Sequence, residues 1–206
     1  MPGRKKTGLR FRGIMMPNSS HPLIRKAKRE ASQPSIHGTK LWKSSALVID
    51  YLVKNPPPFF NRVLDVGCGW GIGGIWCAKK LTSQVTSMDA DPDVFRFLNI
   101  TASINKVKTT PLILKFAQLR KRDLEAFDLL IAADICFWDE LVDPVYRMIE
   151  RAINAGVKQI VISDPERPTF MKMAERCLKK HGGDLLEMET RGSVNARGSL
   201  LVIKNY

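Results

Sequence analysis

A glycine-rich segment with an acid at its head could hold a small cofactor. Asp65-Val66-Gly67-Cys68-Gly69-Trp70-Gly71 completes a short apolar run that begins at residue 63, and an apolar stretch, residues 72–81, follows it. The glycines allow a sharp turn that sits close to a ligand, and the free N–H groups at the start of a following helix would face that ligand. Asp65 would repel a pyrophosphate, whereas it suits a cationic ligand that carries an ammonium and a sulfonium group.

A second acid lies at the spacing expected for a ribose contact. Asp89 stands near the end of a predicted strand, 85–90, and 20 residues after Gly69; a carboxylate is a natural acceptor for two vicinal hydroxyl groups. The segment from Gly69 to Gly74 also satisfies the G-x-G-x-x-G pattern of dinucleotide-binding proteins. Three features argue against a dinucleotide: the acid Asp65, the lack of Lys and Arg in the turn, and a strand pair directly after the fifth strand–helix unit.

The elements that must position these residues alternate between strands and helices. Strands are predicted at 63–66, 85–90, 111–117, 128–134 and 159–163, followed by a closing pair at 184–190 and 199–205. Helices are predicted between the strands, including one that starts at Asp143-Pro144, because apolar residues recur there at i, i+3, i+4 and i+7. The pattern predicts an α/β, doubly wound, mostly parallel sheet with helices on both faces and an antiparallel edge hairpin.

Composition narrows the class of protein. The chain has 206 residues, of which 44% are hydrophobic and 26% charged, as in a soluble globular domain. No apolar run approaches the ~20 residues of a membrane span, and no signal peptide is visible. The four cysteines form no CxxC pair, which indicates free thiols in a reducing compartment. The three histidines show no metal-ligand spacing, so we expect no metal site.

The positive charge is concentrated near the N-terminus. The net charge is +13, and residues 1–45 contain eleven Lys and Arg but one Glu, a net charge of +10. We expect residues 1–36 to form a basic arm, poorly ordered to about residue 20 and with one short helix over 22–31, ahead of a catalytic domain at 37–206. The alternatives are an arm that contacts nucleic acid, an acidic partner or a membrane surface, or a mitochondrial targeting sequence.

The glycine turn together with Asp89 resembles the first two motifs of class I S-adenosylmethionine-dependent methyltransferases. The predicted strand order resembles their seven-stranded, Rossmann-like sheet over roughly residues 40–206. The resemblance implies S-adenosylmethionine as cofactor, with the three glycines near its methionine part, Asp65 on its amino group and Asp89 on the ribose. It implies a cofactor site made of Trp42, Asp65, Gly67, Gly69, Gly71, Asp89, Ala90 and Gln118, in which Gln118 is an adenine partner or a solvated loop residue.

The end of the fourth predicted strand indicates the substrate. Asp134-Ile135-Cys136-Phe137 is similar to the D-x-x-Y/F motif of seven-β-strand protein-lysine methyltransferases, which include those acting on the electron-transfer flavoprotein β subunit. The segment led by Trp42 and the Asp164-Pro165-Glu166-Arg167 stretch resemble two further motifs of that family, although Glu166 stands where the family has glycine. The resemblance implies Asp134 and Phe137 as catalytic residues and a protein substrate that presents a lysine.

Other acceptors remain open from the sequence. The basic arm favours a nucleic-acid methyltransferase, because phosphates are contacted by Lys and Arg, but the fourth strand lacks the N/D-P-P-Y/F motif of base amino-group methylation. A small-molecule N-methyltransferase and a catalytically silent cofactor-binding subunit are further alternatives. We expect a monomer in the cytoplasm, or in the mitochondrial matrix if the arm is a targeting sequence.

Overall fold

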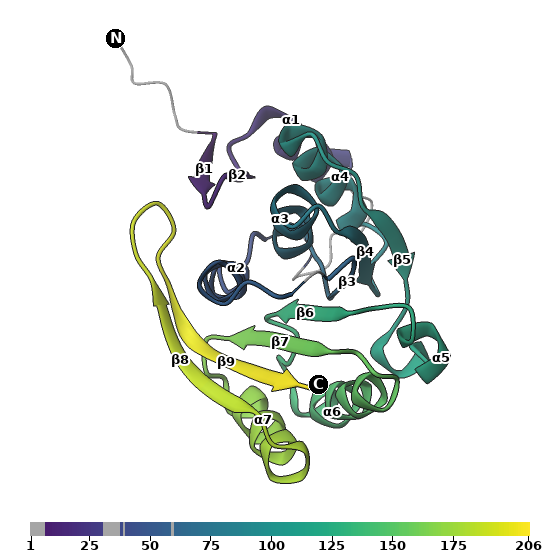
Figure 1. The fold of residues 1–206 in the computed structure, drawn as a ribbon. Coiled ribbons are helices and arrows are strands. Elements are labelled where there is room, and N and C mark those ends of the chain that lie inside the picture. The colour runs from purple at the N-terminus through teal and green to yellow at the C-terminus, as the bar shows by residue number, and fades with distance from the viewer. Residues whose placement is uncertain (1–6, 31–37, 39, 59) are drawn as a thin grey trace.

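Seven strands form one sheet in the order β5-β4-β3-β6-β7-β9-β8 (Figure 1). The computed structural model describes residues 7–30, 38, 40–58 and 60–206. The strands are β3 (Arg62–Val66), β4 (Gln84–Asp89), β5 (Thr110–Ile113), β6 (Leu129–Ala133), β7 (Gln159–Asp164), β8 (Asp184–Thr190) and β9 (Ala196–Lys204). The first five in spatial order are parallel, and β9 runs antiparallel to both β7 and β8. The predicted fold class and its antiparallel edge are confirmed.

Helices cover both faces of this sheet (Figure 1). One face carries α2 (Ser45–Lys54), α3 (Ile72–Lys80) and α4 (Val94–Asn105), and the other carries α5 (Lys121–Leu124), α6 (Asp139–Asn154) and α7 (Pro168–His181). Parallel strands covered on both faces read as continuous apolar runs, and every residue of β7 is buried accordingly. The carboxyl ends of the parallel strands therefore meet at one edge, where the site must lie.

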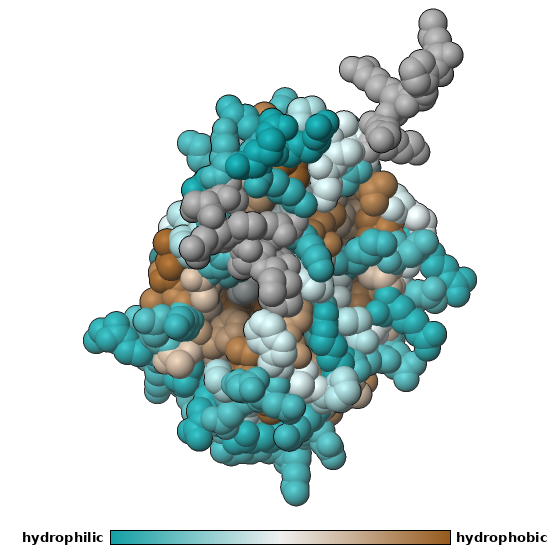
Figure 2. Space-filling view, turned by 180° about the vertical axis from the view of Figure 1, so that it is seen from behind, coloured by the Kyte–Doolittle hydropathy of each residue, from teal (hydrophilic) through white to brown (hydrophobic). Residues whose placement is uncertain are grey.

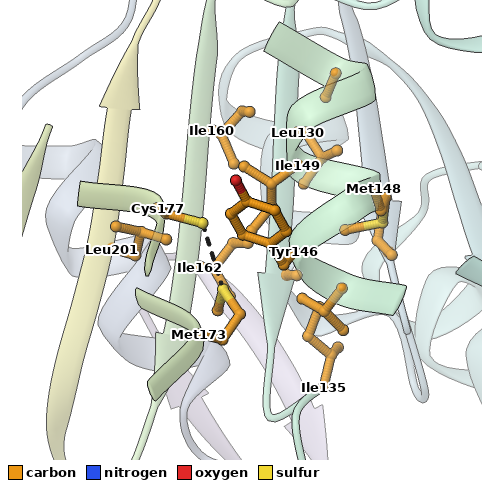
Figure 3. Close-up of a cluster of buried hydrophobic side chains, with 14 of the residues drawn as sticks. Leu130, Ile135, Tyr146, Met148, Ile149, Ile160, Ile162, Met173, Cys177 and Leu201 are labelled. Carbon is orange, nitrogen blue, oxygen red and sulfur yellow. Dashed lines mark hydrogen bonds between the residues drawn. The ribbon is translucent and has the colours of Figure 1, made fainter. Parts of the chain in front are cut away.

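The packing of α6 and α7 onto β6 and β7 forms a large apolar core (Figure 3). Met148 and Ile149 of α6 and Met173 and Cys177 of α7 are all fully buried against the strands. The Cys177 thiol lies 3.7 Å from the sulfur of Met173, and burial raises the pKa of that thiol to about 12. Cys177 is therefore a packing residue, as the i, i+3, i+4 spacing predicts.

Helix α6 begins earlier than the sequence predicts. The prediction placed its start at Asp143-Pro144, but it begins at Asp139, and Pro144 lies inside it. Asp139 and Glu140 occupy the first turn, where carboxylates interact favourably with the unpaired N–H groups. A proline is favoured at the first helical position, and that preference misled the prediction. The third predicted strand is also shorter: β5 ends at Ile113, and the 3-10 turn η1 (Phe116–Gln118) follows.

An N-terminal hairpin packs onto α3 and α4. Strands β1 (Gly8–Phe11) and β2 (Ile14–Pro17) pair antiparallel, which differs from the expectation of a poorly ordered terminus to about residue 20. Asn105 of α4 pairs with both backbone groups of Met15: its Oδ1 accepts from the N–H and its Nδ2 donates to the carbonyl, each at 2.8 Å. Asn105 lies 90 residues after Met15, so the sequence around Met15 gives no sign that the hairpin is held by α4.

The basic helix α1 (Pro22–Glu30) packs beside the glycine turn. Ile24 and Ala27 are buried against Trp70 and Phe97, whose rings stack at 5.2 Å. Arg25, Lys26 and Arg29 are exposed, whereas the Lys28 ammonium lies 5.8 Å from the Trp70 ring centroid. The predicted boundary between arm and domain, at 36/37, lies outside the described residues.

Seen from behind, the surface is mostly hydrophilic, with hydrophobic residues gathered near the middle of that face (Figure 2). Within the described ranges, none of the helices has the length and apolar character to cross a bilayer.

Candidate active site

A cavity of about 300 Å³ lies at the carboxyl ends of β3, β4 and β6. It falls at the size of a small-ligand pocket and at the edge where doubly wound sheets bind ligands. Its lining is mainly apolar, with three carboxylates among it. Seven of the predicted site residues line this cavity: Trp42, Gly67, Gly69, Asp89, Ala90, Asp134 and Phe137.

The glycine turn presents its backbone to the cavity. Gly67, Gly69 and Gly71 have φ of +61°, +51° and +74°, in the left-handed region that favours glycine. A Cβ on Gly69 would meet nothing within 4 Å, because this residue borders the open cavity, whereas one on Gly71 would lie 2.9 Å from Leu98. Gly71 is not among the lining residues; it shapes the turn and allows α3 to begin.

Asp89 joins the glycine turn to the end of β4. Its Oδ2 accepts from the N–H of Gly69 and its Oδ1 from the N–H of Asp91, each at 3.0 Å. Burial raises the pKa of this carboxyl above its usual value. Each carboxylate oxygen has a second lone pair, so Asp89 can still accept hydrogen bonds from a ligand in the cavity.

Asp65 lies behind the turn rather than on the cavity wall. Its Oδ2 accepts from the N–H of Gly74 at 3.0 Å, and a Cβ on Gly74 would approach that oxygen to 2.8 Å. Burial raises the pKa of Asp65 to about 7. In this position the carboxyl fixes the first turn of α3, and its contact with a cofactor amino group stays a prediction.

The side chain of Gln118 turns back toward the backbone of the preceding turn. Its Oε1 accepts from the N–H of Lys115 at 2.8 Å and closes η1. The cavity is lined instead by Phe116 from the same turn. Phe116 is not among the predicted site residues, because it falls inside the strand predicted at 111–117.

Asp134 lines the cavity at the end of β6 and belongs to an ion-paired cluster. Its Oδ1 accepts from Nη1 of Arg167 at 2.9 Å, and the same Nη1 donates to Oδ2 of Asp164 at 2.6 Å. Oδ2 of Asp134 is buried and has no hydrogen-bond partner in the part of the chain that the structure describes. Burial raises the pKa of Asp164 to about 6. In the sequence, Arg167 stands out only as part of the stretch from Asp164 to Arg167.

Aromatic rings form the wall next to Asp134. The Phe137 ring lies 5.2 Å from that of Trp42 and 6.0 Å from that of Trp138. The Arg167 guanidinium lies 4.7 Å from the Phe137 centroid and 5.7 Å from the Trp42 centroid. Trp138 is 54% exposed at the rim, so the wall extends from the buried cavity to the surface.

The loop after β7 keeps a glycine-like backbone despite its glutamate. Glu166 has a φ of +67°, and its Oε1 accepts from the Ser199 hydroxyl at 2.9 Å. A non-glycine residue in this region costs about 1–3 kcal/mol. The departure from the family's glycine therefore leaves the loop in a left-handed conformation, and Arg167 still reaches Asp134.

The residues of the cavity fit a nucleoside cofactor with a cationic end. Gly69 leaves open space, Asp89 offers acceptors, and the buried Oδ2 of Asp91 at the cavity wall has no partner among the described residues. A buried oxygen without a donor costs about 1–3 kcal/mol, which a bound ligand can offset. No group of three or more His, Cys, Asp or Glu suited to a metal ion occurs within the described ranges.

Known proteins match this chain over much of its length. Residues 32–133 match the Methyltransferase small domain family. The electron transfer flavoprotein beta subunit lysine methyltransferase of Danio rerio is 25% identical over 130 residues, which cover 63% of this chain and 50% of that protein. The Histidine protein methyltransferase 1 homolog of Dictyostelium discoideum is 30% identical over 131 residues, which cover 59% and 41%. The structure of magnesium protoporphyrin IX methyltransferase from Synechocystis PCC 6803, with bound SAM, has a TM-score of 0.53 at 15% identity and covers 88% of this chain and 91% of that one.

The sheet order, the cavity and these matches identify the chain as a class I S-adenosylmethionine-dependent methyltransferase. S-adenosylmethionine is its cofactor, so the resemblance drawn from the glycine turn is confirmed at this level. The chain spans about half the length of the curated relatives it matches.

Proposed function

We propose that this methyltransferase transfers a methyl group to a lysine amine of a protein substrate. The observation that carries the proposal is Oδ2 of Asp134, a buried carboxylate oxygen at the cavity that lacks a hydrogen-bond donor among the described residues. A substrate amine would supply that donor. The curated relatives support the protein substrate, since their names specify lysine and histidine methylation of proteins.

The site addresses the main chemical obstacle, which is the proton on the lysine. With a reference pKa of about 10.4, deprotonating the amine at pH 7 costs roughly 4–5 kcal/mol. Bound S-adenosylmethionine supplies a methyl group activated by a sulfonium. The apolar cavity disfavours the charged amine and lowers its pKa, while Asp134 orients the nitrogen through a hydrogen bond. What Asp134 and the walls then contribute is alignment of the nitrogen with the transferable methyl group.

The charges around Asp134 suit a cationic side chain. Asp134 and Asp164 face the single guanidinium of Arg167, so with all three ionised the cluster carries a net charge of −1. Phe137 and Trp138 flank the cavity and offer apolar surface to the lysine stem and ring faces to its ammonium. A cationic substrate is attracted to such a site more than a neutral one.

A nucleic-acid substrate is the second candidate, and one observation favours it. Helix α1 carries Arg25, Lys26, Lys28 and Arg29 beside the glycine turn, and cations so placed could contact phosphates. The aromatic wall could also stack on a base, so an experiment must separate the two candidates.

Labelled S-adenosylmethionine and a cell extract separate the candidates. Label that protease removes and nuclease does not supports the proposal, and acid hydrolysis then distinguishes methyl-lysine from methylhistidine. Label removed by nuclease alone, or found in neither polymer, would overturn it.

Asp134→Ala tests the residue assignment. We expect methyl transfer to fall at least 100-fold while the affinity for S-adenosylhomocysteine stays within about threefold. Asp139→Ala is the matched control, because Asp139 is an exposed acid five residues further on. Full transfer by Asp134→Ala, with cofactor binding intact, would remove Asp134 from the mechanism.

A further inference from the structure

We propose that Arg167 is a positioning residue of this methyltransferase, which orients the Asp134 carboxylate and the aromatic wall for the incoming amine. The inference rests on the proposed function of Asp134. It follows from three observations: the way the guanidinium is shared, the way it is stacked, and the backbone conformation of Asp134.

Arg167 is fixed to the end of β7 at two points. Oδ1 of Asp164 accepts from the backbone N–H of Arg167 at 2.8 Å, and Oδ2 accepts from its guanidinium at 2.6 Å. Asp164 is fully buried. A side chain held at its backbone and at its tip by one carboxylate has little freedom, so its remaining contacts are set in place.

The guanidinium engages one oxygen of Asp134 and leaves the other. Nη1 lies 2.9 Å from Oδ1, whereas Oδ2 has no partner in the described part of the chain. This division makes one oxygen an anchor and the other the acceptor for substrate. Without the anchor, the carboxylate could rotate about its Cα–Cβ bond and its Cβ–Cγ bond and present neither oxygen in a defined direction.

The backbone at Asp134 needs such support. Its φ of +58° is in the left-handed region, which a non-glycine residue adopts only when its surroundings hold it there. The N–H of Asp134 donates to the carbonyl of Ser163 at 2.9 Å, and the Arg167 pair is the restraint on its side chain. Both restraints come from β7 and the loop that follows it, so this segment sets the position of Asp134.

The Arg167 guanidinium also lies over two of the rings that form the wall. Its guanidinium lies 4.7 Å from the Phe137 centroid and 5.7 Å from that of Trp42. Phe137 comes from the loop after β6 and Trp42 from the segment before α2, so one planar cation joins parts of the chain almost a hundred residues apart. A planar guanidinium can pair and stack at once, and an ammonium cannot do both in this geometry.

The exchange Arg167→Lys distinguishes positioning from charge balance. A lysine keeps the positive charge between the two acids, so a purely structural ion pair would leave methyl transfer within threefold of wild type. We expect the initial rate of label incorporation, at saturating cofactor and with a fixed extract as acceptor, to fall at least 20-fold. The melting temperature and the affinity for S-adenosylhomocysteine should stay close to wild type. The control is Arg176→Lys, the same exchange at an arginine of α7 that also pairs with an acid, Asp143, and stacks on a ring, Tyr146.

A double-mutant cycle shows whether Arg167 acts through Asp134. If it does, Arg167→Lys added to Asp134→Asn should slow the residual transfer much less than it slows the wild-type enzyme, because the carboxylate to be positioned is already gone and only the effect on the aromatic wall remains. Losses that multiply would overturn the proposal, as would a wild-type rate for Arg167→Lys or an equal loss of S-adenosylhomocysteine affinity. If wild-type label enters nucleic acid or small molecules instead of protein, the proposed function fails, and the same cycle on that fraction still decides the role of Arg167.

Discussion

The backbone N–H of Gly69 donates to Oδ2 of Asp89 at the wall of the cofactor cavity, at 3.0 Å. This bond ties the turn after β3 to the end of β4. The two motifs that suggested the cofactor therefore form one unit, in which a carboxylate on the cavity wall also holds the glycine turn beside it.

Asp89→Ala should weaken S-adenosylhomocysteine binding roughly 10–100-fold. The substitution removes acceptors that are worth about 1.5–3 kcal/mol when charged, and it leaves the Gly69 N–H unpaired. Isothermal titration calorimetry measures the effect. Asp93→Ala serves as control, because the Asp93 carboxylate pairs with Arg96 at the start of α4 and does not line the cavity. Equal affinities for the two variants would remove Asp89 from the cofactor site.

Gly69→Arg should abolish cofactor binding while leaving a folded protein. A side chain on Gly69 meets open space, and that space is the cavity. Gly156→Arg is a matched control, because Gly156 also has a positive φ, +83°, and also faces open space, but it lies in the turn between α6 and β7. Both variants should lose about 1–2 kcal/mol of stability from the left-handed backbone, and only Gly69→Arg should lose S-adenosylhomocysteine binding. Retained binding would place the ligand elsewhere.

Asp65→Asn should stabilise the cofactor-free protein at high pH and not at low pH. The folded-state pKa of about 7 lies above the unfolded value near 3.9. Between these values the folded protein keeps a proton that the unfolded chain has released, so the stability of the wild type falls as the pH rises through this window. The advantage of the Asn variant should grow from near zero at pH 4 to as much as about 4 kcal/mol at pH 8.

Urea unfolding at several pH values measures this difference. An advantage that is the same at every pH would contradict the raised pKa of Asp65. The same variant should bind S-adenosylhomocysteine more weakly if Asp65 also pairs with the amino group of the cofactor.

Asn105→Ala should release the N-terminal hairpin from α4. The substitution leaves both backbone groups of Met15 without their partner, at a cost of about 2–4 kcal/mol. Hydrogen exchange of the β1–β2 amides should accelerate more than that of β3. Asn99→Ala, at an exposed position on the same helix, should change neither. Unaltered exchange in Asn105→Ala would show that apolar packing alone holds the hairpin.

The parts of the molecule that could be predicted from sequence are those encoded by local patterns. Buried parallel strands are continuous apolar runs, and the glycine turn needs glycine at fixed positions, so the sheet and the location of Asp89 and Asp134 followed directly. The contacts of Arg167 and Asn105 depend on partners that only the tertiary fold brings within reach. The contact of Gln118 is local, but it depends on which rotamer the side chain adopts. The start of α6 was missed because Pro144 was given more weight than the acids at Asp139 and Glu140.

The placement of β9 between β7 and β8 has a consequence for synthesis of the chain. Gln159 of β7 pairs with Lys204 of β9, 45 residues later. At translation rates of about 5–20 residues per second, β7 exists for roughly 2–9 s before its last partner has been made. During that interval a strand that is fully buried in the final fold has an open edge, which is the kind of surface that pairs with other chains. The order of strands along the gene, as well as their final arrangement, therefore sets how long the nascent chain carries this unpaired strand edge.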